Sequence, residues 1–307
     1  MSSFADPYPS RVDPEPRWLP RRDPVVWPVA WNGKAHAEGP LTQGQLADYE
    51  RDGFLFFPGL FQESEIAALA DEMNRLSRDA AVLSREGSIT EPSSGDLRTV
   101  FEIHKASALF EKLAQDPRVA GAAEQLLGDA VYVSQSRLNY KPGFRAKEFY
   151  WHSDFETWHV EDGMPRMRAL SISITLTENY AFNGPLMVIP GSHRWFVSCV
   201  GETPEDHYKT SLKRQDYGVP DDESLRRLVA DGGVFSTTGK AGSVILFDCN
   251  IMHGSNSNIT PFPRSNAFFA FNAMSNAVGA PFGGSERRPD FLCERHPYPV
   301  RPTRRAA

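Results

Sequence analysis

The feature that most constrains the fold of this chain is the spacing of His152 and Asp154 in the run Trp151-His152-Ser153-Asp154. In an extended strand, residues i and i+2 point to the same face. The imidazole and the carboxylate can therefore aim at one point, while Ser153 turns away. The same spacing is also typical of a surface histidine beside an acidic residue, so a further ligand has to decide between the two interpretations.

The best candidate for a third ligand is His253, which lies far along the chain in Met252-His253-Gly254. Two histidines and one carboxylate at three corners of an octahedron, with the other positions open, are typical of non-haem Fe(II) oxygenases. We therefore predict a metal site made by His152, Asp154 and His253.

Alternating residues predict strands throughout the second half of the chain. One face of 131–140 carries Val133, Gln135, Arg137 and Asn139, which form either a solvated edge or the lining of a polar cavity. In 168–176 the polar face carries Ser171, Ser173 and Thr175. Helices followed by many short strands with Gly/Pro turns indicate a mainly antiparallel double-sheet jelly roll (a double-stranded β-helix) with helical support. A parallel α/β fold would need alternating helices and strands, which this half lacks.

The first 40 residues are rich in proline and include Trp18, Trp27 and Trp31. Such a density of proline excludes a long helix or a central strand. We predict an extended arm over 1–40 that packs on the body of the protein or on a second subunit. The rest, 41–307, is predicted to be a single domain. It comprises helices over 41–130, a jelly-roll core over about 131–275 and an irregular tail.

Helical patterns begin at Leu41, with Thr42 as the N-cap of a first helix and Gly53 as its end. Residues 84–96 are polar and are predicted to form a surface loop. Residues 201–240 are predicted to be an excursion between strands, with a short helix near 222–230. Loops of that length are often functional lids.

A second group of functional side chains is expected near His253. Period two over 244–253 places Phe247 and His253 on one side of a strand, and the next strand begins at Arg264. If the two strands are neighbours, His253 and Arg264 lie close together. A guanidinium fork there is suited to hold a carboxylate, and Ser255 offers a hydroxyl. For Arg264 alone, a surface charge is the competing interpretation, and for Phe247 and Phe268 it is core packing.

Composition narrows the class of protein. The net charge of −6 argues against a general nucleic-acid or anionic-membrane binder. The longest apolar runs are too short to span a membrane, and the N-terminus lacks the order of a secretory signal. Three widely spaced cysteines do not suggest a disulfide framework or a zinc cluster. These features fit a cytoplasmic protein.

With these residues identified, the chain resembles the phytanoyl-CoA dioxygenase superfamily of Fe(II)/2-oxoglutarate enzymes, and within it the ectoine hydroxylases. The order His152-x-Asp154, His253, Arg264 carries the resemblance, together with Asn183-Gly184-Pro185-Leu186 and Ile189-Pro190-Gly191-Ser192-His193. The run from Trp151 to Pro165 is similar to a segment that distinguishes ectoine hydroxylases, and Gln135-Ser136-Arg137-Leu138-Asn139 matches as well. The resemblance covers roughly 40–290.

The resemblance implies a role for each candidate residue. Iron would be bound by His152, Asp154 and His253. The distal carboxylate of 2-oxoglutarate would be held by Arg264 and Ser255, with Arg137, Asn139 and Ser171 as further contacts. The substrate pocket would be formed by Gln135, Trp158, Phe247 and Phe268, with Arg288 for the substrate carboxylate.

It also implies the reaction. 2-Oxoglutarate and O2 would be cosubstrates, and ectoine, a small zwitterion used in the response to osmotic stress, would be hydroxylated to 5-hydroxyectoine by a cytoplasmic homodimer. One alternative is a hydroxylase of another small amino-acid-like molecule. Another is a jelly-roll binding protein without oxygenase turnover, or a metal-dependent lyase. The complete ligand set argues against a catalytically inactive binding protein.

Overall fold

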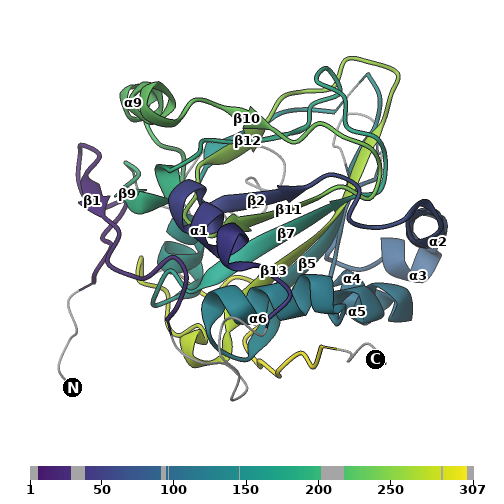
Figure 1. Cartoon of the computed structure of the whole chain (residues 1–307), viewed down its shortest axis with the longest axis horizontal. Coiled ribbons are helices and arrows are strands. Elements are labelled where there is room, and N and C mark those ends of the chain that lie inside the picture. The colour runs from purple at the N-terminus through teal and green to yellow at the C-terminus, as the bar shows by residue number, and fades with distance from the viewer. Residues whose placement is uncertain are drawn as a thin grey trace.

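The computed structural model describes residues 6–28, 39–90, 95, 97–144, 146–201, 218–284 and 286–302. Two antiparallel sheets face each other at its centre (Figure 1). The larger has seven strands, in the order β2 (Phe54–Phe57), β11 (Val244–Asp248), β7 (Ala169–Thr175), β13 (Arg264–Ala273), β5 (Val131–Lys141), β4 (Leu97–Phe101) and β3 (Ser88–Thr90). The smaller has four, in the order β10 (Phe235–Ser236), β8 (Leu186–Val188), β12 (His253–Ser255) and β6 (Phe149–His152). The predicted jelly roll is confirmed.

Helices support one face of the larger sheet. The helical segments are α1 (Gln43–Asp52), α2 (Glu63–Leu76), α3 (Ala80–Leu83), α4 (Ile103–Ala106), α5 (Ala108–Ala114), η2 (Pro117–Gly121), α6 (Ala122–Leu127), α7 (Asp154–Thr157), η3 (Trp158–Asp162), η4 (Ser192–Arg194), α9 (Asp222–Gly232) and η5 (Met274–Asn276). Apolar side chains of α1, α2, α5 and α6 form one core with alternate residues of the central strands, such as Leu246 and Phe269. The residues between them, such as Phe247 and Phe268, turn toward the smaller sheet. Each central strand therefore serves two cores.

The boundaries of α1 follow from its cap residues, as predicted. The Thr42 side chain accepts a hydrogen bond from the Gln45 N–H, and the Gln45 side chain accepts one from the Thr42 N–H. This capping box satisfies donors that a helix start leaves unpaired. Gly53 ends the helix with φ +80°, and a Cβ there would lie 2.3 Å from Nδ1 of His193. The helix at 222–230 is confirmed as α9, whereas 202–217 of the predicted excursion 201–240 lies outside the described residues.

Three details differ from the sequence prediction. Ser88–Thr90 forms the edge strand β3 inside the predicted loop 84–96, because it pairs with β4. The larger sheet includes β3 and β4, and also β2, where a strand is expected from the run Phe54-Leu55-Phe56-Phe57, so it extends beyond 131–275. Val133 faces the helical core and not the cavity. The register of β5 against β13 shifts between Ala270 and Phe271, and this bulge reverses the face of the residues before Gln135.

The N-terminal segment 6–28 runs along the body of the chain. Its short strand β1 (Trp18–Pro20) pairs with β9 (Trp195–Val197). Buried ion pairs fix it further, including Arg21 to Asp248 at 2.7 Å. Across the described residues, no helix has both the length and the apolar character that a membrane crossing requires.

Candidate active site

The predicted metal ligands converge between the two sheets. His152 ends β6 and pairs with His253, which opens β12. Asp154 does not continue the strand as expected, because Ser153 caps a short helix and Asp154 is its first residue. The three side chains still converge on one point. One ligand atom from each of the three residues lies within 4.8 Å of the others, with Oδ1 of Asp154 3.9 Å from Nε2 of His152 and 3.7 Å from Nε2 of His253.

The surroundings prepare these side chains to bind a cation. Nδ1 of His152 donates to the Tyr150 carbonyl at 2.7 Å, and Nδ1 of His253 donates to the Ile251 carbonyl at 3.1 Å. These bonds leave each Nε2 lone pair free. Burial, and then the neighbouring His253, lowers the pKa of His152 to about 4, which favours the neutral, ligating form. The donor set and its outer hydrogen bonds thus fit Fe(II).

Ser171 takes a different position from the one predicted. Its hydroxyl donates to Oδ2 of Asp154 at 3.0 Å, which leaves Oδ1 facing the histidines. It does not line the cavity, so the arrangement favours orienting Asp154 over contacting 2-oxoglutarate. Phe247 is also absent from the lining. It is fully buried, its ring centroid lies 5.0 Å from that of His253, and it packs in the core between the sheets.

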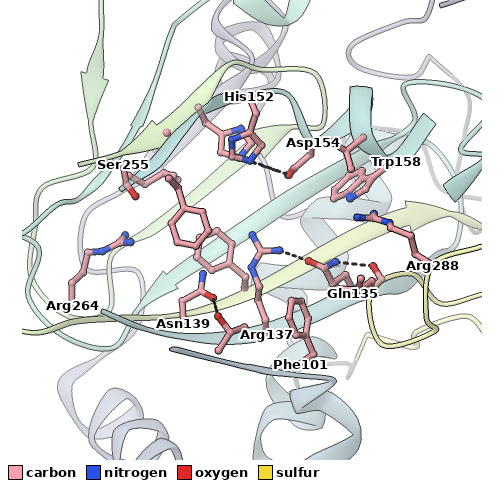
Figure 2. Close-up of a pocket in the computed structure, with 18 residues that line it drawn as sticks. Phe101, Gln135, Arg137, Asn139, His152, Asp154, Trp158, Ser255, Arg264 and Arg288 are labelled. Carbon is pink, nitrogen blue, oxygen red and sulfur yellow. Dashed lines mark hydrogen bonds and ion pairs between the residues drawn. The ribbon is translucent and has the colours of Figure 1, made fainter. Parts of the chain in front are cut away.

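A single cavity brings the remaining predicted residues together (Figure 2). His152 and Asp154 lie between two ends, with Arg264 and Ser255 on one side and Trp158 and Arg288 on the other. The predicted residues that line it are Gln135, Arg137, Asn139, His152, Asp154, Trp158, His253, Ser255, Arg264, Phe268 and Arg288. His253 and Arg264 are not on neighbouring strands, because β12 belongs to the smaller sheet and β13 to the larger. They face the cavity from opposite sheets.

One end of the cavity is cationic. Arg264 is 4% exposed, and its Nε and Nη1 have no hydrogen-bond acceptor within the described part of the chain. Burial lowers its pKa to about 10. Lys141 is also buried, and its Nζ donates to Oγ of Ser255 at 3.1 Å and to the Asn256 carbonyl. Burial, and then Arg264 and Arg98, lowers the pKa of Lys141 to about 6. A buried guanidinium without a carboxylate is suited to an anionic ligand.

The other end combines aromatic and polar groups. Trp158 begins η3, directly after the helix that carries Asp154. Arg288 lines the cavity and is also paired, because its Nε donates to Oδ1 of Asp162 at 2.9 Å and its Nη1 lies 3.4 Å from Glu161. Gln135 accepts a hydrogen bond from Arg137 and donates to the Leu292 carbonyl at 2.7 Å. The guanidinium of Arg137 lies 4.8 Å from the Phe268 ring centroid.

The sequence interpretation missed several lining residues, namely Thr99, Phe101, Phe149, Thr157, Leu186, Gly254 and Leu292. Thr99 and Phe101 share one face of β4, and their period-two spacing was the available signal. Thr157 lies within the segment already singled out, and its Oγ1 is buried without a partner in the described residues. Leu292 lies in the irregular tail, where no periodicity marks it.

The sequence and the structure are similar to those of known proteins. Residues 49–266 match the family described as Phytanoyl-CoA dioxygenase (PhyH). An ectoine dioxygenase of Bordetella bronchiseptica is 54% identical over 303 residues, which is 98% of this chain and 97% of the relative. One of Sphingopyxis alaskensis is 55% identical over 290 residues, or 94% of this chain and 93% of the relative.

Solved structures of other proteins have a similar fold. The crystal structure of EctD from S. alaskensis with 2-oxoglutarate and 5-hydroxyectoine superposes with a TM-score of 0.86 at 50% identity, covering 96% of this chain and 97% of that chain. The same protein with bound Fe gives 0.84 at 49% identity, with the same coverage of both chains. The carbocyclase SnoK, at 18% identity and a TM-score of 0.58, covering 76% of this chain and 85% of its own, shares the fold alone.

Proposed function

The chain belongs to the phytanoyl-CoA dioxygenase family, and we propose that it hydroxylates ectoine to 5-hydroxyectoine as an Fe(II)- and 2-oxoglutarate-dependent dioxygenase. One observation carries the proposal. A single cavity holds the His-Asp-His triad between the buried guanidinium of Arg264, whose Nε and Nη1 find no acceptor among the described residues, and an end formed by Trp158 and Arg288. An anion and a small zwitterion can therefore occupy opposite sides of one metal ion.

The triad would hold the iron through Nε2 of His152, Nε2 of His253 and Oδ1 of Asp154. Bound iron and 2-oxoglutarate supply the oxidative chemistry, in which O2 and 2-oxoglutarate yield succinate, CO2 and one oxygen atom for a C–H bond of the substrate. The Ser171 hydroxyl keeps Asp154 oriented toward the histidines. Asp154 and His253 are buried and His152 is partly buried, which limits the access of bulk water to the site.

At the cationic end, Arg264 and Ser255 would hold the distal carboxylate of 2-oxoglutarate. Because Lys141 donates to the Ser255 oxygen, the Ser255 proton is free to point at a second acceptor. Arg137 and Asn139 face the same cavity and would add contacts along the molecule. Asn139 accepts from Thr99 through Oδ1, so its amide N–H groups remain available to a carboxylate.

At the other end, Trp158 offers an aromatic face to the delocalised amidinium of ectoine. Such a contact is worth about 0.5–2 kcal/mol, depending on desolvation. Arg288 and Gln135 would hold the ectoine carboxylate and ring, with Phe268 as an apolar wall. Phe247 would act indirectly, by packing behind His253.

The test is to incubate the protein with Fe(II), 2-oxoglutarate, O2 and ectoine, and to measure ectoine mass together with succinate. One added oxygen per succinate supports the proposal, and ¹⁸O2 should supply the label. Asp154→Ala is the matched control and should yield neither product. Succinate formation without a modified ectoine would favour another amino-acid-like substrate. Binding of ectoine without any succinate would favour a binding protein.

We further propose that the enzyme acts in the cytoplasm as a homodimer and makes a solute for osmotic stress. All three cysteines are buried free thiols, which fits a reducing compartment. The sequence resemblance supports the dimer and the role in osmotic stress, and the negative net charge supports the proposal that nucleic acid and membranes are not partners. Light scattering coupled to size exclusion tests the dimer, since a single peak at the monomer mass of 34.3 kDa would contradict it.

A further inference from the structure

The segment that carries Asp154 and Trp158 is unusually acidic in the interior. Glu156, Glu161 and Asp162 all lie on α7 and η3, and each is at most 2% exposed. A buried carboxylate is stable only when it is paired and hydrogen-bonded. The cations that neutralise these three groups therefore determine how the segment sits against the cavity.

One of these cations comes from the N-terminal arm. Arg11 donates from Nε and Nη2 to the two carboxylate oxygens of Glu156, at 3.0 and 2.7 Å, and from Nη1 to Oε1 of Glu161 at 2.7 Å. Its side chain is 3% exposed. Burial alone would lower the pKa of Arg11, but Glu156 and Glu161 raise it above its usual value. The guanidinium fork thus spans α7 and η3.

The arm is fixed around this contact. Ser10 donates to Glu156 at 2.6 Å, and the backbone N–H of Arg11 donates to the Cys199 carbonyl at 2.9 Å. Arg11 adopts φ +60°, a left-handed conformation that a long side chain keeps only when its surroundings fix it. Gly218 covers the ion pair so closely that a Cβ would lie 2.8 Å from Nη2 of Arg11 and 2.8 Å from Oε2 of Glu156.

The same carboxylates reach the cavity. Glu161 lies between Arg11 and Arg288, with Oε1 bound to Arg11 and Oε2 3.4 Å from Nη1 of Arg288. Arg288 is held by Asp162 as well, at the end of η3. Trp158, at the start of η3, faces the cavity beside Arg288 (Figure 2). A continuous series of charged contacts therefore connects the arm to the substrate end, while the cationic end around Arg264 lies outside it.

We propose that Arg11 is a positioning residue for the substrate end of the cavity, because it holds Glu156 and Glu161 so that Trp158 and Arg288 face the bound substrate. The inference rests on the proposed function for the identity of that substrate. It also assigns the arm a part in the site, since without Arg11 the buried Glu156 and Glu161 lose the guanidinium that bridges them, and Glu161 shares Arg288 with Asp162. The cationic end should be insensitive to this change.

The test compares Arg11→Met with Arg21→Met. Arg21 is a matched control because it is another buried arginine of the arm, 2.7 Å from Asp248, and it contacts neither α7 nor η3 through any hydrogen bond in the described residues. Ectoine binding to the anaerobic Fe(II)/2-oxoglutarate protein is measured by calorimetry. 2-Oxoglutarate binding is measured from the absorption band it forms with iron. Both variants should lower the melting temperature.

Arg11→Met should weaken ectoine binding at least about tenfold, raise the ratio of succinate to 5-hydroxyectoine and leave 2-oxoglutarate affinity within about twofold. Arg21→Met should leave all three readouts near wild type. Arg11→Lys keeps the charge but cannot bridge two carboxylates, so its ectoine affinity should lie between those of wild type and Arg11→Met. It serves as the test variant if Arg11→Met does not fold. Normal ectoine binding in both Arg11 variants would overturn the proposal, as would an equal loss of both ligands.

Hydrogen exchange separates this inference from the proposed function. Backbone amides of η3 should exchange faster in Arg11→Met than in wild type or Arg21→Met, whatever the substrate proves to be. Unchanged exchange in η3 would contradict the positioning role even in an active enzyme. A wild-type protein that leaves ectoine unmodified would instead contradict the proposed function, and the exchange result would still decide the role of Arg11.

Discussion

Arg264 carries a positive charge into the interior without a counter-ion among the described residues. Removing it should therefore have opposite effects on binding and on stability. Arg264→Met should weaken 2-oxoglutarate binding by about a hundredfold, close to 3 kcal/mol, because a buried charged contact is lost. The ligand-free protein should become more stable, because an uncompensated buried charge is gone.

Titration of the iron absorption band and thermal melts of the ligand-free protein check both effects. Arg264→Lys should recover only part of the affinity, since a point charge does not replace the fork. Lys141→Met is the companion variant and should weaken binding less, because Lys141 acts through Ser255. If 2-oxoglutarate affinity is unchanged in Arg264→Met, the carboxylate is held elsewhere, with Arg137 as the next candidate.

The metal ligands should matter more for iron binding than for folding. Asp154→Ala and His253→Ala should lose bound iron yet keep the fold, because both residues face the cavity and contribute little to the apolar cores. Ser171→Ala should keep the iron with reduced affinity, roughly ten- to a hundredfold, as expected when a partner that orients a ligand is removed. Iron content and far-UV circular dichroism of the purified variants are the measurements. Full iron occupancy in His253→Ala would remove that residue from the site.

At the scale of elements, η3 and the C-terminal tail depend on each other at Gly163. This glycine has φ +80°, and a Cβ would lie 2.3 Å from the carbonyl oxygen of Ala280. Gly163→Ala should destabilise the protein by clearly more than the roughly 1–2 kcal/mol of left-handed strain alone, and displace the tail that carries Arg288. We therefore expect weaker ectoine binding as well as a lower urea midpoint.

Gly59→Ala is the matched control. Gly59 has φ +64° with no atom within 4 Å of an added Cβ, so this variant should lose only the stability that left-handed backbone strain removes. Equal losses of stability in both variants would show that the contact with Ala280 is unimportant. Unchanged ectoine binding in Gly163→Ala would show that the position of the tail does not affect the substrate end of the cavity.

The elements also show where reasoning from sequence succeeds. Alternation correctly placed the serines of β7 on the face opposite the helical core, because that strand pairs regularly with both neighbours. It failed at Val133, because a bulge is set by the partner strand and leaves no mark in the local pattern. It also joined Phe247 and His253 in one strand, whereas a turn after Asp248 moves His253 to the other sheet. Long-range pairs such as Arg11 with Glu156 have no local signal at all.

For the whole molecule, buried histidines make stability depend on pH. Burial is the main cause that lowers the pKa of His104 and of His193 to about 4 each. The unfolded chain, with a pKa near 6.5, then binds more protons than the native state between pH 4 and 6.5, so stability falls as pH falls through that window. At pH 5 each of these histidines should lower the free energy of unfolding by about 2 kcal/mol relative to its value at pH 8.

Urea unfolding of wild type, His104→Gln and His193→Gln at pH 8 and pH 5 measures this dependence. Each variant should lose less stability than wild type on acidification, by about 2 kcal/mol. An identical pH dependence in all three proteins would mean that neither buried histidine governs it.

The two ends of the cavity come from different parts of the chain, so substrate specificity can change while the cationic end stays the same. The cationic end comes from β5, β12 and β13, which are hydrogen-bonded into the sheets, whereas the other end is completed by α7, η3 and the irregular tail. Mutation can therefore alter Thr157 and Leu292 without disturbing a sheet register or the buried ion pairs of Arg288. Libraries restricted to those positions are a direct route to hydroxylases that retain the oxidant and accept new heterocycles.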